Sequence, residues 1–569
     1  MIKRVIAFLL SAIMIIPVLS GCSKYDPNED VGETINIYLS NEVYDFDPAF
    51  AYRSKDALQI SRLLFAGLFY INADGELKKN LVDDYEITDD DDKEIYRITF
   101  ELKESYWSDG SLVSAKDYLF AWKRLLDPNV ISDAAVLLYE IKNAYDAKNG
   151  NCSIDDIGVY AINNSTLQID FEKPIDFEDF LYNLASPCLV PLRESTVSGN
   201  DDWSKRPLTI LCNGPFIIRE VSYGSSLVLE RNAYFKRDRE KDSIKKYVTP
   251  YRIVVDYTKT PAEQIEAYKN GEIDYVGNIA LSNREEYESK AKISDALSTL
   301  SCYFNLDNEI FADANTRKAL SLAIDRQAIA DALVFASPAT ALVPSGVFEA
   351  TSAKKSFRSV GGDYLAKNAD LDAAKQLGSF SGSFSISLAD NEVNIAVAEM
   401  LKSAWEQLGF DVDIVKLSTT PTKVVLPGEK APTKEFVNDA YLTCLRERNF
   451  DVILTEVSAL DTDAFSILAP FAEGYTGRNI EFTVDSYTDP VNITGYNSDE
   501  YNALIDSAFA EKKVSARASI LHEAEEMLMT DLPVVPLVFT KNAVLISGDL
   551  ENITRDYFGY RSFTKAELD

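Results

Sequence analysis

The sequence of 569 residues contains a single histidine, His522, and this scarcity excludes much enzyme chemistry. A catalytic triad with a histidine base, or a metal site built from several histidines, is not available. The chain also lacks the patterns GxSxG, HExxH, GxxxxGK[ST] and GxGxxG, which mark hydrolases, metalloproteases and nucleotide-binding loops. His522 lies in an amphipathic run, 516–529, where we expect it at the surface or the boundary of the core. We therefore expect no enzymatic activity, no cofactor and no metal.

Positive charge is scarce relative to negative charge. The chain has 57 Lys and Arg residues against 90 Asp and Glu residues, a formal net charge of −33. Nucleic-acid binding needs a basic surface that neutralises phosphates, so we expect no nucleic-acid partner. Four adjacent aspartates, Asp89–Asp92, lack the alternating ligands and closing glutamate of a calcium loop. We interpret them as the solvated tip of a hairpin.

Long apolar runs are absent except at the N-terminus, so no later segment could span a membrane. At the start, Lys3 and Arg4 precede the apolar stretch 5–18, and small residues precede Cys22. These three parts are the anatomy of a secretory signal.

The sequence around Cys22, VLSGCSK, resembles the lipobox of bacterial lipoproteins. In that motif the cysteine carries diacylglycerol and becomes the mature N-terminus. The resemblance implies a signal peptide over 1–22 and a lipid anchor on Cys22, which would hold the protein at the extracytoplasmic face of the cell membrane. Two acyl chains are enough for stable anchoring. The polar segment 23–32 is predicted to be a tether.

The other five cysteines show no CxxC spacing. Cys188 and Cys212 are the nearest pair in sequence, and outside the cytoplasm they could form a disulfide. The alternative is that both are unpaired buried thiols.

A chain of this length is too long for one core and predicts two large lobes. Its mixture of strands and helices, without sustained alternation, predicts α/β lobes with sheets. The apolar periodicity predicts helices over 56–69, 115–126, 262–270, 315–335, 392–408, 500–511 and 516–529. It predicts strands over 34–39, 96–102, 167–172, 216–219, 226–230 and 252–257.

One stretch, YWSDGSLVSAKDYLFAWKRLLDP over 106–128, predicts a Ser-Asp-Gly turn, an N-cap at Ser114 and an amphipathic helix. It resembles the signature of the extracytoplasmic solute-binding proteins of peptide ABC importers, the oligopeptide- and dipeptide-binding family. The matching residues are Trp107, Ser108, Asp109, Gly110, Ser114, Ala115, Asp117 and Arg124.

The resemblance continues in order along most of the chain, which makes it more specific than a single motif. The matching segments are LSNEVYDFDP (39–48), NGPF (213–216), VLERN (228–232), YKNGEID (268–274), CYFNLDNEIFADANTRKALSLAIDR (302–326), VNIAVAEMLKSAWEQLGF (393–410), NFDV (449–452) and GYN (495–497).

The resemblance implies a two-lobed α/β fold of the periplasmic-binding-protein kind (type II, cluster C), with an extra domain inserted in the N-terminal lobe. A monomer is expected. The implied parts are lobe I over 33–70, 191–301 and 536–569, the inserted domain over 71–190, and lobe II over 302–535.

The implied function is to capture peptides in the cleft between the lobes and deliver them to the permease of an ABC importer. The peptide would be held as an added strand. The predicted ligand-binding residues are Glu42, Val43, Tyr44, Tyr303, Val457, Ser458 and Asp461.

In many relatives, the aspartate of a W-x-x-D-Y segment binds the free amino terminus of the ligand. This sequence departs from the family in that segment. Here Val457 replaces the tryptophan and Leu460 the aspartate, with Asp461 one place later. Either Asp461 or Asp463 takes this role after a one-residue bulge, or the amine is read otherwise, or the ligand has no free amine. Arg446 and Arg448 either meet a carboxyl terminus or pair with surface acids.

Two alternatives to peptide import stay open. The same fold could bind a non-peptide ligand, such as an oligosaccharide stacked on aromatic rings or a metal complex. A peptide-sensing receptor that is not coupled to transport is the other alternative.

Overall fold

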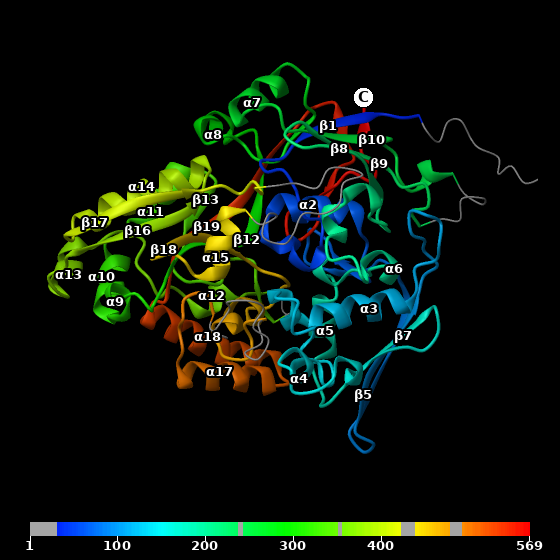
Figure 1. The fold of residues 1–569 in the computed structure, drawn as a ribbon, viewed down its shortest axis with the longest axis horizontal. Helices are drawn as coiled ribbons and strands as arrows, with labels where there is room; N and C mark the ends of the chain where they lie inside the picture. The colour runs from blue at the N-terminus through cyan, green and yellow to red at the C-terminus, as the bar shows by residue number, and fades with distance from the viewer. Residues whose placement is uncertain (1–30, 237–242, 351–354, 423–438, 478–491) are drawn as a thin grey trace, which may run out of the picture.

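The computed structural model describes residues 31–236, 243–350, 355–422, 439–477 and 492–569 (Figure 1). The predicted signal peptide and Cys22 lie outside these ranges. None of the helices within the described ranges is long and apolar enough to cross a membrane.

A large mixed sheet runs through the middle of the molecule. Its strands, in spatial order, are β17 (Phe410–Leu417), β16 (Gly382–Ala389), β18 (Val452–Ser458), β12 (Lys292–Phe304), β19 (Val534–Ile546), β11 (Tyr275–Val276), β1 (Thr34–Tyr38), β10 (Arg252–Asp256), β9 (Ser226–Arg231) and β8 (Phe216–Ser222), with β13 (Ala336–Pro338) beside β19. We call β11, β1, β10, β9 and β8 the first sheet half, and β17, β16 and β18 the second.

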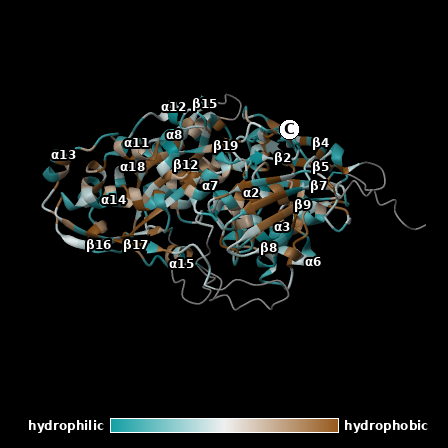
Figure 2. Cartoon of the chain, turned by 90° about the horizontal axis from the view of Figure 1, so that it is seen from above, coloured by the Kyte–Doolittle hydropathy of each residue, from teal (hydrophilic) through white to brown (hydrophobic). Residues whose placement is uncertain are grey.

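The long strands β12 and β19 join the two halves and pair with each other along most of their length. In Figure 2 they lie between β16 and β17 at one end of the molecule and β8 and β9 toward the other. Their register shifts between Asp295 and Thr299 and again after Leu300. Leu297, inside the first shift, has a φ of 50°, as expected for a bulge that bends a strand. The two halves are therefore linked by an irregular ribbon.

Helices cover the sheet and give the second half its own core. The helices are α2 (Lys55–Leu64), α3 (Ala115–Leu126), α4 (Ala144–Lys148), α5 (Phe177–Asn183), α6 (Glu194–Val197), α7 (Pro261–Lys269), α8 (Arg284–Tyr287), α9 (Glu309–Ala312), α10 (Ala314–Leu322), α11 (Arg326–Leu333), α12 (Phe357–Gly361), α13 (Leu371–Gln376), α14 (Glu392–Glu406), α15 (Ala440–Glu447), α16 (Phe465–Leu468), α17 (Asp499–Ala510) and α18 (Val514–Asp531). In the second half, the buried Trp405 of α14 donates its indole N–H to the carbonyl of Leu320 on α10, at 3.0 Å.

The single helix predicted over 315–335 is wrong, because the chain forms α10 and α11 with a break between them. Asp325 caps the second helix by accepting a hydrogen bond from the backbone N–H of Ala328. α11 then ends at Leu333, because Val334 has a φ of 61°. Phe335 therefore lies outside the helix.

A second, four-stranded sheet lies entirely within residues 71–190. Its order is β4 (Val82–Asp90), β5 (Ile95–Leu102), β7 (Thr166–Phe171) and β6 (Val159–Ala161). The aspartate run ends β4 and forms the turn to β5, which confirms the predicted hairpin tip. The helix predicted over 115–126 is confirmed as α3, with Ser114 and Asp117 forming a capping box.

Helices α17 and α18 reach from the second half to this part of the chain (Figure 1). Arg517 of α18 lies 3.2 Å from Asp179 of α5 and 2.9 Å from Asp463. The rings of Tyr145 and Tyr475 pack nearby, with centroids 5.1 Å apart. The two parts therefore also touch through a buried polar and aromatic contact.

Short two-stranded ladders complete the fold. They are β2 (Phe69–Ile71) with β3 (Leu77–Lys79), β14 (Phe348–Ala350) with β15 (Lys355–Ser356), β20 (Leu550–Glu551) with β23 (Glu567–Leu568), and β21 (Thr554–Arg555) with β22 (Arg561–Ser562).

The disulfide considered between Cys188 and Cys212 is not formed. Both are free, buried thiols, and burial raises the pKa of each to about 12. They pack as small apolar groups, and Cys212 Sγ also lies 3.8 Å from the carbonyl oxygen of Ile210.

Candidate functional site

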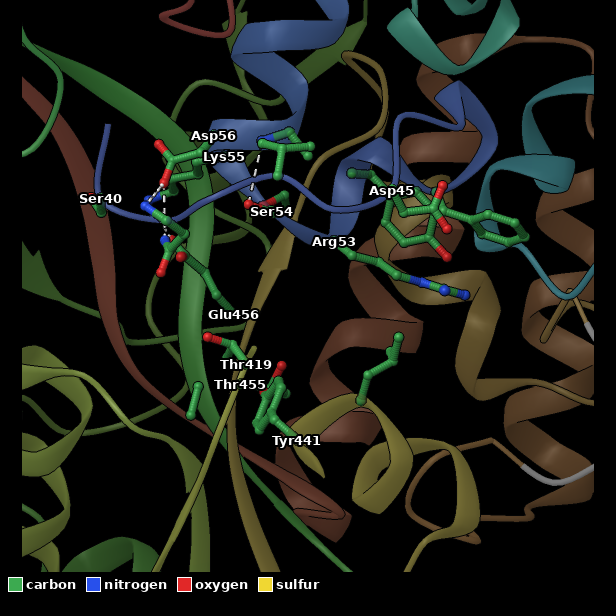
Figure 3. Close-up of a pocket in the computed structure, with 18 of the residues that line it drawn as sticks. Ser40, Asp45, Arg53, Ser54, Lys55, Asp56, Thr419, Tyr441, Thr455 and Glu456 are labelled. Atoms are coloured by element: carbon green, nitrogen blue, oxygen red, sulfur yellow. Dashed lines mark hydrogen bonds and ion pairs between the residues drawn. The ribbon is translucent and has the colours of Figure 1, made fainter. Parts of the chain in front are cut away.

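A cavity of about 1690 Å³ lies between the two sheet halves. On one side it is lined by residues 38–45, the 3₁₀ helix η1 (Pro48–Arg53) and the first turns of α2. The other side is formed by β18 and by the N-terminal parts of α14 and α15. The crossing strands contribute Tyr303 and residues 540–544. Figure 3 shows part of this cavity.

The loop after β1 brings the three predicted residues Glu42, Val43 and Tyr44 to the cavity. The Glu42 carboxylate accepts hydrogen bonds from the backbone N–H of Gly224, at 3.0 Å, and from the Tyr44 hydroxyl, at 2.6 Å. The Tyr44 ring stacks on Tyr223, with centroids 5.3 Å apart. Glu42 therefore also holds the loop against the turn between β8 and β9.

A buried carboxyl group, Asp56, stands beside this loop near the start of α2. It accepts hydrogen bonds from the backbone and side-chain nitrogens of Asn41, at 2.7 and 2.9 Å (Figure 3). Burial raises the pKa of Asp56 to about 6. Asp56 is thus a polar part of the wall whose charge changes in mildly acidic solution.

The opposite wall contains three more of the predicted residues, which are Val457 and Ser458 of β18 and Tyr303 on the neighbouring strand β12. Tyr303 is buried and its ring stacks on Phe471, with centroids 6.0 Å apart. Six of the seven predicted ligand-binding residues therefore lie around one cavity.

Asp461 is the predicted residue that the structure does not bring there. Among the described residues, those that line the cavity include Leu460 and Ser466 but not Asp461. Its side chain is buried and accepts hydrogen bonds from the Ser466 hydroxyl, at 2.7 Å, and the backbone N–H of Asp463, at 3.1 Å. Burial, with the charge of Asp463 beside it, raises the pKa of Asp461 to about 7. Asp461 thus belongs to the contact around Arg517.

Of the two arginines considered for binding a carboxyl terminus, the structure places one at the cavity and the other away from its lining. Arg446 lines the cavity. Arg448 pairs with Asp307 at 2.9 Å and donates a hydrogen bond to the Asn305 side chain at 3.1 Å. Only the first of the two faces the cavity among the described residues.

An ion pair inside the cavity was not foreseen from the sequence. The ammonium of Lys55, the first residue of α2, lies 2.7 Å from the carboxylate of Glu456 on β18. The hydroxyls of Ser298 and Thr540 donate to the same carboxylate oxygen at 2.5 Å each. A signal was available, because Glu456 is the one charged residue of the strand VILTEVS, which begins with three apolar residues.

Other charged and aromatic side chains enclose the cavity near η1. The guanidinium of Arg53 lies 4.4 Å from the ring centre of Phe50 and donates to the carbonyl of Ile131 at 3.0 Å. The Tyr441 hydroxyl of α15 donates to the carbonyl of Leu454 at 3.1 Å. The cavity therefore combines aromatic faces with charges of both signs.

Within the described part of the chain, no group of three or more His, Cys, Asp and Glu side chains is arranged to hold a metal.

Comparison with known proteins gives concordant matches. The family model described as bacterial extracellular solute-binding proteins, family 5 Middle, matches residues 76–479. The dipeptide-binding protein DppE of Bacillus subtilis (strain 168) is 26% identical over 557 residues, which cover 94% of this chain and 92% of DppE. The probable deoxycholate-binding periplasmic protein YgiS of Escherichia coli (strain K12) is 26% identical over 506 residues, covering 85% of this chain and 84% of YgiS.

A solved structure, Listeria monocytogenes OppA bound to peptide, has a TM-score of 0.76 to this chain at 21% identity. The match covers 94% of this chain and 99% of that one. This likeness shows the fold and confirms the predicted two-lobed α/β architecture with an inserted domain.

Proposed function

Because the chain belongs to family 5 of the bacterial extracellular solute-binding proteins, we propose that it binds peptides in the cavity between its lobes. We further propose that it delivers them to the permease of an ABC importer. Relatives named as dipeptide- and oligopeptide-binding proteins support a peptide ligand.

The observation that carries this proposal is the cavity itself. Its volume of about 1690 Å³ exceeds the roughly 300–1,000 Å³ of ordinary small-molecule sites. The cavity is also bounded by the strand β18, whose neighbours in the sheet are β12 and β16. Space of this size, with polar groups on both walls, suits an extended chain of several residues.

In the proposed mechanism, the two lobes close over a ligand that has entered the cavity. The lobes are joined by β12 and β19, whose irregular pairing around Leu297 is a suitable place to bend. A ligand that touches both walls stabilises the closed form by the contacts that it makes only there. The closed form would then dock on the permease.

We also propose that Cys22 carries a lipid and keeps the protein at the extracytoplasmic face of the membrane. The proposal is supported by the lipobox-like sequence and by the extracellular character of the family. A monomer with a polar tether suits this arrangement.

A second ligand class, amphipathic molecules that are not peptides, is favoured by two observations. One is the relative named for deoxycholate binding. The other is the aromatic part of the lining, formed by Phe50, Tyr52, Tyr303, Phe335 and Phe471. The binding experiment below separates the two classes.

The test measures the unfolding temperature of the purified protein with a pool of short peptides and, separately, with deoxycholate. A ligand at 100 times its Kd adds about 2.7 kcal/mol of stability, so a binder raises the unfolding temperature. Ser458→Trp, which places a large side chain in the cavity wall at β18, should abolish the increase. Val415→Trp on β17, at a position 39% exposed, is the matched control and should keep it. An increase with deoxycholate alone would refute the peptide proposal.

A further inference from the structure

The cavity contains a carboxylate that already holds an ammonium group, and the two come from opposite walls. Lys55 Nζ lies 2.7 Å from Glu456 Oε1 and 3.2 Å from Thr540 Oγ1. Lys55 belongs to α2, which packs on the first sheet half, and Glu456 to β18 in the second. Figure 3 shows both residues at the cavity. The ammonium of Lys55 thus bridges the two walls at a carboxylate that lines the cavity.

Glu456 is held as an acceptor independently of Lys55. The hydroxyls of Ser298, on β12, and Thr540, on β19, each donate to Oε1 at 2.5 Å. Burial would raise the pKa of Glu456, but Lys55 and the two hydroxyls together hold this pKa below its usual value. The carboxylate is therefore ionised at neutral pH and is oriented by the crossing strands.

Lys55 can leave this site at little cost. Its side chain is 36% exposed and that of Glu456 is 30% exposed, and ion pairs with this much exposure contribute little to stability. The ammonium stands on a flexible four-carbon stem. The two polar contacts of Nζ within the described residues, to Glu456 and Thr540, both lie at this one site. An exchange of one ammonium for another would keep both contacts.

We propose that Glu456 recognises the ammonium group of the ligand and that Lys55 is displaced from it when such a ligand binds. The inference rests on the proposed function and names its ligand class: peptides with a free amino group. The freed ammonium of Lys55 remains on the opposite wall, where it can pair with a ligand carboxylate or carbonyl. A ligand without an amine leaves the Lys55–Glu456 pair in place and gains no such contact.

The experiment measures the binding of two probes to the purified protein by equilibrium dialysis. One probe is a pool of short peptides with free amino termini, and the other is the same pool after N-acetylation. We expect Glu456→Gln to weaken binding of the free-amine pool about fivefold, because the ligand ammonium loses its ionised partner. Binding of the acetylated pool should stay unchanged.

The reciprocal variant is Lys55→Met, which removes the internal competitor. We expect it to strengthen binding of the free-amine pool about threefold or more and to leave the acetylated pool unchanged. Asp413→Asn and Lys416→Met, at exposed positions of β17, are the matched charge controls and should alter neither pool.

The outcomes separate this inference from the proposed function. An equal loss for both pools in Glu456→Gln, or weaker binding of both pools by Lys55→Met, would overturn the exchange. The Lys55–Glu456 ion pair would then only hold the two walls of the cavity together. If the unchanged protein binds neither pool, the proposed function fails and this inference fails with it.

Discussion

At the scale of single residues, the chemistry of Asp461 is set by the buried carboxyl groups around Arg517. The guanidinium of Arg517 lies 2.9 Å from Asp463, 3.2 Å from Asp179 and 3.8 Å from Glu140. Burial raises the pKa of Glu140 and, with the charge of Asp463 beside it, that of Asp179. One arginine thus faces more acids than it can neutralise, and the pKa of Asp461 beside them is raised to about 7.

This environment predicts a pH-dependent stability that Asp461→Asn should remove. The pKa of Asp461 is about 7 in the folded protein and about 3.9 in an unfolded chain, so folding favours its protonated form. The stabilising contribution is complete below about pH 4 and is lost as the pH rises toward 7. Relative to the variant, the unchanged protein should lose up to about 1.4 kcal/mol per pH unit in this window.

Urea unfolding at several pH values between 4 and 8 measures this difference. Asp506→Asn is the control and should keep the slope of the unchanged protein, because Asp506 accepts from the Tyr475 hydroxyl and forms no ion pair with Arg517 among the described residues. A slope for Asp461→Asn that parallels the unchanged protein would contradict the assignment. Since Asp461 lies away from the cavity lining, its substitution should also leave the ratio of free-amine to acetylated peptide binding unchanged.

At the scale of elements, the helix α3 is fixed by a local capping signal and supports a segment that lines the cavity. The Ser114 hydroxyl and backbone N–H both bond the Asp117 carboxylate and close the first turn. The same helix carries Arg124, which forms an ion pair with the buried Asp47 just before η1. α3 therefore supports the segment that leads to Arg53 and Lys55 in the cavity wall.

We expect Ser114→Ala to lower the free energy of unfolding by about 1 kcal/mol, because it removes the hydroxyl half of the capping box. Ser403→Ala, at an exposed position inside α14, is the matched control and should change stability by no more than about 0.5 kcal/mol. Chemical denaturation of both variants under one condition decides the point. Equal stability losses in the two would show that the cap contributes nothing.

Most elements were predictable because their signals are local. The capping serine and apolar spacing gave the bounds of α3, and the short strands β1, β9 and β10 were located within one residue at each end. The break between α10 and α11 was missed because the apolar periodicity continues through it. Asp325 carried the missing signal, since an aspartate three residues before a helical N–H is a typical cap.

The site was predictable only in part, because its chemistry comes from distant segments. The resemblance located the loop at Glu42 and the strand at Val457, both of which line the cavity. The polar cluster in its wall joins Lys55, Ser298, Glu456 and Thr540, which lie far apart in the sequence and cannot be brought together by a local pattern. Asp461 failed to reach the cavity because its side chain turns to Ser466 and the contact around Arg517.

At the scale of the whole molecule, the two parts on either side of the cavity are connected in two places. β12 and β19 join the sheet halves on one side, and Arg517 and the aromatic rings of Tyr145 and Tyr475 join α18 and the inserted domain on another. The first connection is continuous chain and stays intact in any motion. The second is made of side-chain contacts alone, so in the proposed mechanism an opening of the cavity would either break it or carry the inserted domain along.

The proposed lipid anchor would hold the whole molecule at the membrane, and the Cys22→Ser variant tests it. Without the thiol no diacylglycerol can be attached, and a surface with a net charge of −33 is repelled by anionic lipid. We expect the variant to move from the membrane fraction to the soluble fraction with unchanged affinity for peptides. A variant that stays firmly in the membrane fraction would contradict the lipobox interpretation, and Cys444→Ser serves as the control that should remain membrane-bound.

Native mass spectrometry of the protein purified without denaturation tests whether the cavity between the lobes is a peptide site. We expect retained masses that resolve into short peptides with free amino groups, and we expect Ser458→Trp to lose them. A protein that is empty, ignores added peptides and shifts in mass only with a bile acid or a glycan would contradict it.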